Sequence, residues 1–100
     1  MPITIQPSTK ADKKLMVKID YPDVKRTIHI GSKGMSDFTK NKDPERKKRW
    51  IARHSVRGDP NDPLKAYFWA LNVLWNKTSL EASKKDAIRK AKSLLKKMRY

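Results

Sequence analysis

The segment from Leu64 to Trp75 is apolar nearly all round, and it limits the folds open to this chain more than any other feature. A helix with apolar side chains on every side has to be buried on several sides. The chain has 100 residues, enough for one modest core, and it has no cysteine with which to cross-link that core. We therefore expect the fold to rest on packing alone, within the chain or across a homodimer that buries this helix.

Two short strands are predicted ahead of the helices. Leu15, Val17 and Ile19 alternate with Met16 and Lys18, which is the two-residue period of a half-buried strand. The TIHIG sequence at residues 27–31 alternates in the same way, and the intervening DYPD is typical of a turn. These two strands form the hairpin with which we expect the folded domain to begin.

Residues 1–12 contain two prolines and little periodicity. They are interpreted as a flexible arm or as a short edge strand. The domain organisation expected from the sequence is a flexible N-terminal arm over residues 1–12 and a single α+β domain over residues 13–100. In that domain the N-terminal β-hairpin is followed by three helices.

Proline-containing turns and capping residues mark the starts of the three helices. Asp43 followed by proline predicts a helix that runs to about His54, and Asp62 followed by proline repeats the signal before the apolar segment. Thr78 with Glu81 has the spacing of a capping box for the last helix. The apolar residues of that helix fall within one arc: Leu80, Ala87, Ile88, Ala91, Leu94, Leu95 and Met98.

The formal net charge is +15, from 25 basic and 10 acidic residues, and it gathers in two clusters over residues 40–57 and 84–99. So much like charge in one small domain opposes folding by self-repulsion unless a polyanion neutralises it, which favours nucleic acid as the partner. The residues expected to contact phosphates are Lys40, Lys42, Arg46, Lys47, Lys48, Arg49, Arg53, Arg57, Lys85, Arg89, Lys92 and Lys96.

The same sequence carries no clear signature of catalysis. His29 and His54 do not form a zinc motif, and GSKGMS lacks the glycine spacing and the Gly-Lys-Ser/Thr ending of a phosphate-binding loop. Carboxylates at positions 20, 23 and 37 could bind Mg²⁺, but turn formation explains them more simply. Trp50 follows Lys-Lys-Arg and could either stack on unpaired bases or belong to the core. We expect a protein that is not an enzyme and that needs no cofactor or metal.

The sequence resembles a family of small uncharacterised basic proteins encoded by large DNA viruses of protists. The resemblance spans about residues 13–90 and follows TIHIG, DFTK, Asp43 with ERKKRW, RH at 53 and 54, LWNK at 74–77 and SLEAS. The chain departs from the family pattern between Val56 and Leu64, at the turn GDPNDP. The resemblance implies a viral origin and a role in genome compaction or packaging, in the virion or in the viral factory.

Taken together, the sequence predicts an intracellular protein, not secreted and not bound to a membrane, that binds nucleic acid through Lys and Arg contacts to phosphates. Sequence-independent binding to double-stranded DNA is preferred over RNA, and a small-molecule substrate is not expected. Two alternatives remain open. One is a structural virion or interaction protein with an acidic protein partner, and the other is a metal-dependent nuclease.

Overall fold

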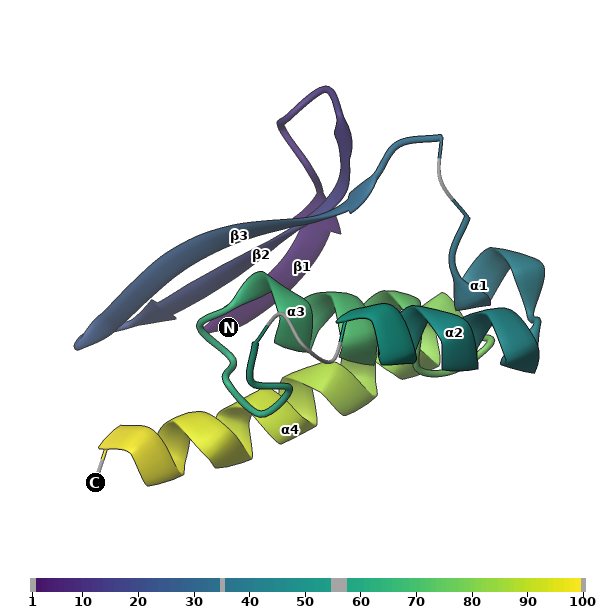
Figure 1. The fold of residues 1–100 in the computed structure, drawn as a ribbon. Coiled ribbons are helices and arrows are strands. Elements are labelled where there is room, and N and C mark those ends of the chain that lie inside the picture. The colour runs from purple at the N-terminus through teal and green to yellow at the C-terminus, as the bar shows by residue number, and fades with distance from the viewer. Residues whose placement is uncertain (1, 35, 55–57, 100) are drawn as a thin grey trace. The chain divides into compact units, whose positions relative to one another are not determined.

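The computed structural model describes residues 2–34, 36–54 and 58–99, with the backbone alone at residues 98 and 99. It shows an α+β chain in which three strands precede the helices (Figure 1). The α+β class predicted from the sequence is therefore confirmed. The chain divides into two compact units, residues 1–35 and residues 36–100, so this boundary does not coincide with the one predicted at residue 13.

The first unit is an antiparallel sheet in the order β1-β2-β3. The predicted hairpin consists of β2 (Lys13–Tyr21) and β3 (Val24–Ser32), and Tyr21 pairs with Val24 across a two-residue turn. The segment predicted as an arm or an edge strand forms β1 (Ile3–Pro7), which pairs with β2 at the edge of the sheet. The correction to the predicted fold is thus a three-stranded sheet in place of a two-stranded hairpin, since residues 3–7 are a strand and not part of a flexible arm.

One face of the sheet carries the apolar side chains that the alternation predicts. Cross-strand neighbours on this face include Ile3 with Ile19 and Val17 with Ile28, and all four are buried. Thr27 is exposed on the other face, as predicted, but Met16 is also buried there. The hydroxyl of Thr9 donates a hydrogen bond to the sulfur of Met16. The turn between β1 and β2 therefore helps to bury Met16, which the alternation of apolar and polar residues does not predict.

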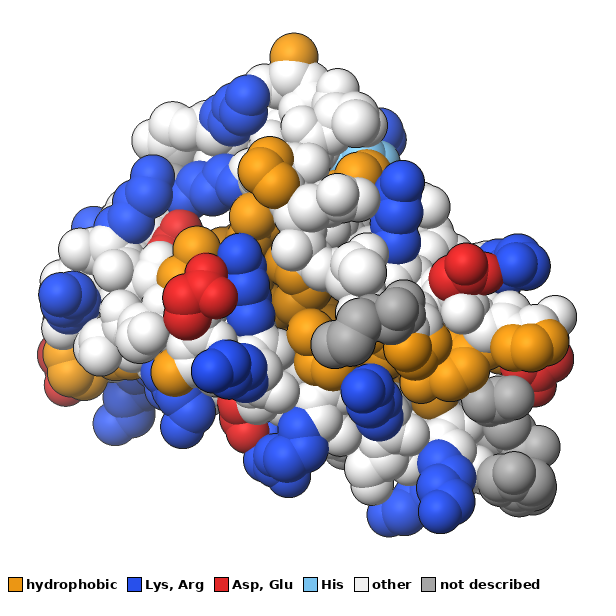
Figure 2. Space-filling view, turned by 180° about the vertical axis from the view of Figure 1, so that it is seen from behind, with side chains coloured by type: hydrophobic (Ala, Val, Ile, Leu, Met, Phe, Trp, Pro, Cys, Tyr) orange, Lys and Arg blue, Asp and Glu red, His pale blue; other side chains and the backbone are white. Residues whose placement is uncertain are grey.

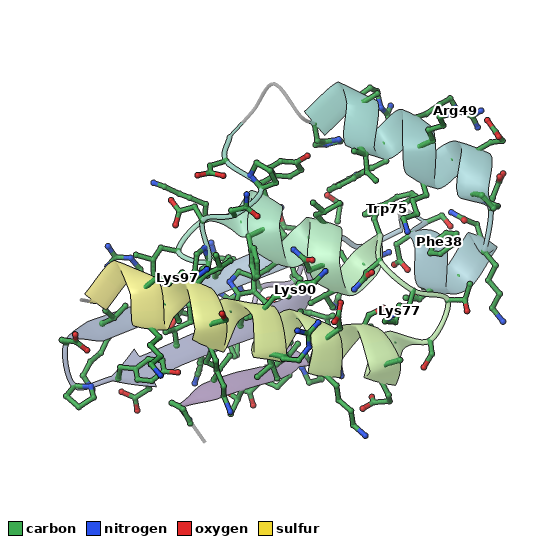
Figure 3. The ribbon with its side chains drawn as sticks, turned by 90° about the horizontal axis from the view of Figure 1, so that it is seen from below. Phe38, Arg49, Trp75, Lys77, Lys90 and Lys97 are labelled. Carbon is green, nitrogen blue, oxygen red and sulfur yellow. The ribbon has the colours of Figure 1, made fainter. Side chains whose placement is uncertain are left out.

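The second unit contains α1 (Phe38–Asn41), α2 (Pro44–His54), α3 (Ala66–Trp69), η1 (Ala70–Leu74) and α4 (Leu80–Arg99). The short helix α1 is missing from the sequence prediction, which interpreted Asp37 as a turn former. In the structure Asp37 caps α1 by accepting a hydrogen bond from the Thr39 N–H. Figure 3 shows α3 and η1 lying between α2 and α4, and Figure 1 shows that α2 and α4 run in the same direction.

The central segment α3–η1 differs from the predicted regular helix over Leu64–Trp75. It begins at Ala66, because Asp62 accepts from the Leu64 N–H in a turn that precedes the helix. At η1 the backbone widens into a π-turn, in which the Trp75 N–H donates to the Ala70 carbonyl five residues back. The amide of Asn72 donates to the Phe68 carbonyl, at the four-residue spacing that a backbone N–H would supply in an α-helix.

The apolar central segment is buried within one chain. Its buried residues are Phe68, Trp69, Asn72, Val73, Leu74 and Trp75. A second subunit is therefore not needed to cover this segment. The homodimer was predicted because this segment has to be buried, and since one chain buries it, the homodimer stays a prediction without that support. Among the described residues, no helix combines the length and the apolar character that crossing a bilayer requires.

Candidate nucleic-acid interface

Helix α2 presents the first basic cluster, and its start is fixed by the predicted cap. The Asp43 carboxylate accepts hydrogen bonds from the backbone N–H groups of Glu45 and Arg46, at 3.0 and 3.4 Å. Pro44 occupies the first helical position, where no N–H is needed. The predicted start of this helix is therefore confirmed, and the cap holds the first turn from which the basic side chains project.

Arg46, Arg49 and Arg53 form one line along α2, which we call the α2 stripe. At about 100° per residue they fall within an arc of about 60°. All three are exposed, and no salt bridge joins them to a carboxylate in the part of the chain that the structure describes. Figure 3 shows Arg49 on the side of α2 that faces away from Trp75. The stripe is thus available to an anion outside the protein.

Lys47 belongs to the same run of sequence but has a different environment. Its ammonium donates to the backbone carbonyl of Asn76 at 2.7 Å and lies 4.8 Å from the centre of the Phe38 ring. The side chain is only partly exposed, whereas its neighbour Lys48 is exposed. Lys47 therefore joins α2 to α1 and to the end of the central segment, and it is poorly placed to contact phosphate.

Trp50 attaches α2 to the central segment. Its ring stacks with the rings of His54 and Trp75, with centroids 4.2 and 5.3 Å away, and the Tyr67 ring lies 5.9 Å away. His54 also forms a hydrogen bond through Nδ1 to the Trp50 carbonyl. Because three aromatic rings contact the half-buried indole, the geometry favours the core interpretation of Trp50 over base stacking, and His54 belongs to the same packing.

Helix α4 presents the second basic cluster. Lys85, Arg89, Lys92 and Lys96 are exposed and fall within an arc of about 60°, which we call the α4 stripe. Ala87, Ala91 and Leu95 on the other side of the helix are buried. The predicted amphipathic arrangement is therefore confirmed for the residues whose side chains are described, which leaves Met98 outside. The cap is corrected: Ser79, not Thr78, accepts from the Ala82 N–H.

Asp86 organises the cations on the side of α4 that faces the central segment. Its carboxylate accepts from Arg89 at 2.6 Å and from the Asn76 amide at 2.8 Å, and Lys90 lies 3.2 Å away. Lys90 also donates to the Asn72 side chain at 3.1 Å. The bonds from Arg89 and Asn76, and then that from Lys90, hold the pKa of the Asp86 carboxyl well below its usual range despite partial burial.

A shallow groove of about 400 Å³ lies beside this network. Phe68, Leu71 and Leu94 give it an apolar wall, and Arg89 and Lys90 give it a cationic one. Lys90 is absent from the predicted contact residues. Its position four residues after Asp86 was the available signal, since that spacing on a helix favours an ion pair.

The remaining predicted contact residues are Lys40, Lys42 and Arg57. Lys40 is exposed in the last turn of α1, and Lys42 is exposed in the left-handed conformation that ends this helix. Arg57 lies outside the described residues. Over residues 2–34, 36–54 and 58–99, no three His, Asp or Glu side chains gather into a group that could hold a metal ion.

Lys and Arg side chains are spread over the face shown in Figure 2, with several acidic side chains among them. The two units share this charge unequally. Residues 1–35 have seven basic and three acidic residues, a net charge of +4, and residues 36–100 have eighteen and seven, a net charge of +11. The helical unit therefore carries most of the positive charge, and seven of its eighteen basic residues form the α2 and α4 stripes.

Comparison with known proteins gives one match. Residues 3–54 match the model of a protein family that is described as a family of unknown function (DUF5754). The match includes the sheet, α1 and α2 with its stripe, and it ends before the central segment and α4. No curated protein and no solved structure matches the chain. The family description names neither an activity nor a source, so the viral origin stays a prediction.

Proposed function

The chain belongs to the DUF5754 family of unknown function, and from this starting point we propose that it binds double-stranded nucleic acid, DNA above all, through contacts to phosphates. The observation that carries the proposal is the α2 stripe. Its three arginines are exposed on one face of a capped helix, and no described carboxylate pairs with them. Arginine is well suited to this task because its planar guanidinium can donate two hydrogen bonds to one phosphate.

Binding of this kind does not depend on base sequence. Phosphate contacts fix the position of a protein on the duplex and carry no sequence information directly. The stacking of Trp50 with His54 and Trp75 supports this expectation, because the indole already makes ring contacts within the protein. We therefore expect the protein to prefer duplexes to single strands and to treat different duplex sequences alike.

The proposal is tested by replacing Arg46, Arg49 and Arg53 with glutamine, which removes three charges and retains good helix propensity. Affinity is measured by fluorescence anisotropy with two duplex DNAs of unrelated sequence, a duplex RNA and a single strand, over a series of salt concentrations. If each arginine neutralises one phosphate, the slope of log K against log[salt] should shrink by about 2.7. The loss should be the same for both DNA sequences.

The matched control replaces Lys18, Lys65 and Lys77 with glutamine. These lysines are exposed and lie outside both stripes, and the change in net charge is the same. A control that loses as much affinity as the arginine variant would contradict a defined interface. If the wild-type chain binds no duplex but is retained by an acidic protein, the proposal fails in favour of the interaction-protein alternative. Cleavage of plasmid in Mg²⁺ or Mn²⁺ would favour the nuclease.

A further inference from the structure

The α2 and α4 stripes lie on opposite faces of the helical unit, and we propose that one chain thereby binds two separate duplex segments and bridges them. This inference rests on the proposed function and extends it from one interface to two. It depends only on residues 36–100, which form one compact unit.

The central segment α3–η1 separates α2 from α4, as Figure 3 shows. On the α2 side, Trp75 and Tyr67 contact Trp50. On the α4 side, Asn72 binds Lys90, and Asn76, which follows η1, binds Asp86. The inward faces of α2 and α4 are therefore turned toward each other across the central segment.

On each helix, the stripe points in a different direction from the residues that face the central segment. Around the helix axis, the two directions differ by a similar angle on α2 and on α4, and the rotation from one to the other is in the same direction. At about 100° per residue, the α2 stripe lies about 100° counter-clockwise from Trp50, His54 and Lys47, viewed from the N-terminal end. The α4 stripe lies about 110° counter-clockwise from Asp86 and Lys90 in the same view. The two stripes thus have the same relation to the central segment on the two helices.

The helices α2 and α4 run in the same direction, and their inward faces point toward each other across the central segment (Figures 1 and 3). On both helices the stripe is turned from the inward face by about the same angle and in the same direction. The two stripes therefore point toward opposite sides of the layer formed by α2, the central segment and α4. A single straight duplex can then lie along one stripe but not along both. The α2 stripe extends over about 10 Å and the α4 stripe over about 16 Å, from the rise of about 1.5 Å per residue. Each is long enough to contact several phosphates of its own duplex.

Arg89 is the one member of the α4 stripe that is already paired, since it binds Asp86. Its side chain is nevertheless 71% exposed. Lys85, Lys92 and Lys96 are exposed as well, and among the described residues no carboxylate pairs with them. Each face thus offers three unpaired cations, so each can neutralise phosphates of its own duplex.

The test measures capture of a fluorescent duplex by an immobilised duplex, with protein limiting. The wild-type chain should capture it well above background. The α2 variant (Arg46, Arg49 and Arg53 to glutamine) and the α4 variant (Lys85, Lys92 and Lys96 to glutamine) should each still bind one duplex in anisotropy but lose at least about tenfold in capture. Arg89 is retained in the α4 variant so that its bond to Asp86 stays intact.

Each outcome decides between the interface and the bridge. If the wild-type chain binds duplexes but captures none, the inference is wrong and the proposed function stands. If it binds none, the proposed function itself fails. Undiminished capture by either variant would also overturn the inference, because one face together with self-association would then suffice. The variant of Lys18, Lys65 and Lys77, which has the same net charge as each stripe variant, should capture like the wild type.

Discussion

At the scale of single residues, Lys47 and Lys48 show how far neighbours in a charged run can differ. The sequence treats them alike, as two members of Arg-Lys-Lys-Arg. On the helix they are about 100° apart, which turns Lys47 toward the Asn76 carbonyl and the Phe38 ring and leaves Lys48 in solvent. One cation therefore stabilises the fold, and the other remains a candidate contact.

We expect Lys47→Ala to lower the free energy of unfolding by about 1–3 kcal/mol, because it removes a hydrogen bond from a charged donor and a cation–π contact. Lys48→Ala is the matched control and should leave stability unchanged within about 0.5 kcal/mol. Urea unfolding followed by circular dichroism measures both. Equal stability of the two variants would mean that Lys47 is as solvated as its neighbour.

The types of residue at the candidate interface could be predicted from sequence, but their individual roles could not. The periodic spacing of Lys85, Arg89, Lys92 and Lys96 was sufficient to place them on one face of a helix. The role of Lys47 depends on Asn76, 29 residues away, and that of Lys90 depends on Asn72, 18 residues away. No local pattern contains such pairs, because they form only when the helices pack.

At the scale of elements, the strands and helices that have a clear apolar period were predicted. Of the elements that lack one, α1 was missed, and residues 3–7 were left open between an arm and an edge strand. The alternation of β2 and the capped start of α2 are both found in the structure. The four residues of α1 are too few for any period. Residues 3–7 become a strand because β2 offers them an edge, which is a property of the sheet and not of their own sequence.

Asp86 connects α4 to the central segment, and this connection should depend on pH. Its pKa is lowered in the folded chain, so the unfolded chain takes up the proton first as the pH falls. The stabilisation is therefore fully present above the ordinary carboxyl pKa of 3.8 and is lost as the pH falls toward the folded value. Asp86→Asn should cost about 1–3 kcal/mol near pH 7 and less near pH 3.

Urea unfolding at both pH values measures this difference. Asp20→Asn is the control, because Asp20 also forms an ion pair with lysine but both side chains are more than two-thirds exposed. Water screens such a pair, and we expect no measurable change at either pH. A stability difference for Asp86→Asn that stays constant down to about pH 3 would exclude the carboxylate as its source.

At the scale of the whole molecule, the net charge of +15 opposes folding in the absence of a polyanion. The variant with Lys85, Lys92 and Lys96 replaced by glutamine lowers this repulsion and leaves the buried Ala87, Ala91 and Leu95 in place. It should unfold at the same temperature as the wild type or up to about 4 °C higher at low salt. The difference should disappear near 1 M salt, where the Debye length is about 3 Å.

Calorimetry at the two salt concentrations provides the measurement. A lower melting temperature of the variant at low salt would show that these lysines stabilise the fold. That result would contradict the hypothesis that the basic surface binds a polyanion and lowers the stability of the free protein.

The π-turn at η1 has a consequence for helical phase. In an uninterrupted α-helix, Tyr67 and Trp75 would stand about 80° apart around the axis, because eight residues exceed two turns. One residue taken up by the wide turn reduces the effective separation to seven, and the two side chains then differ by only about 20°. Both contact the Trp50 ring, with centroids 5.9 and 5.3 Å away. The wide turn thus takes up one residue without disturbing the alignment of the two side chains that contact α2. A chain shortened by one residue there, wound as an ordinary α-helix, would keep Tyr67 and Trp75 in nearly the same alignment.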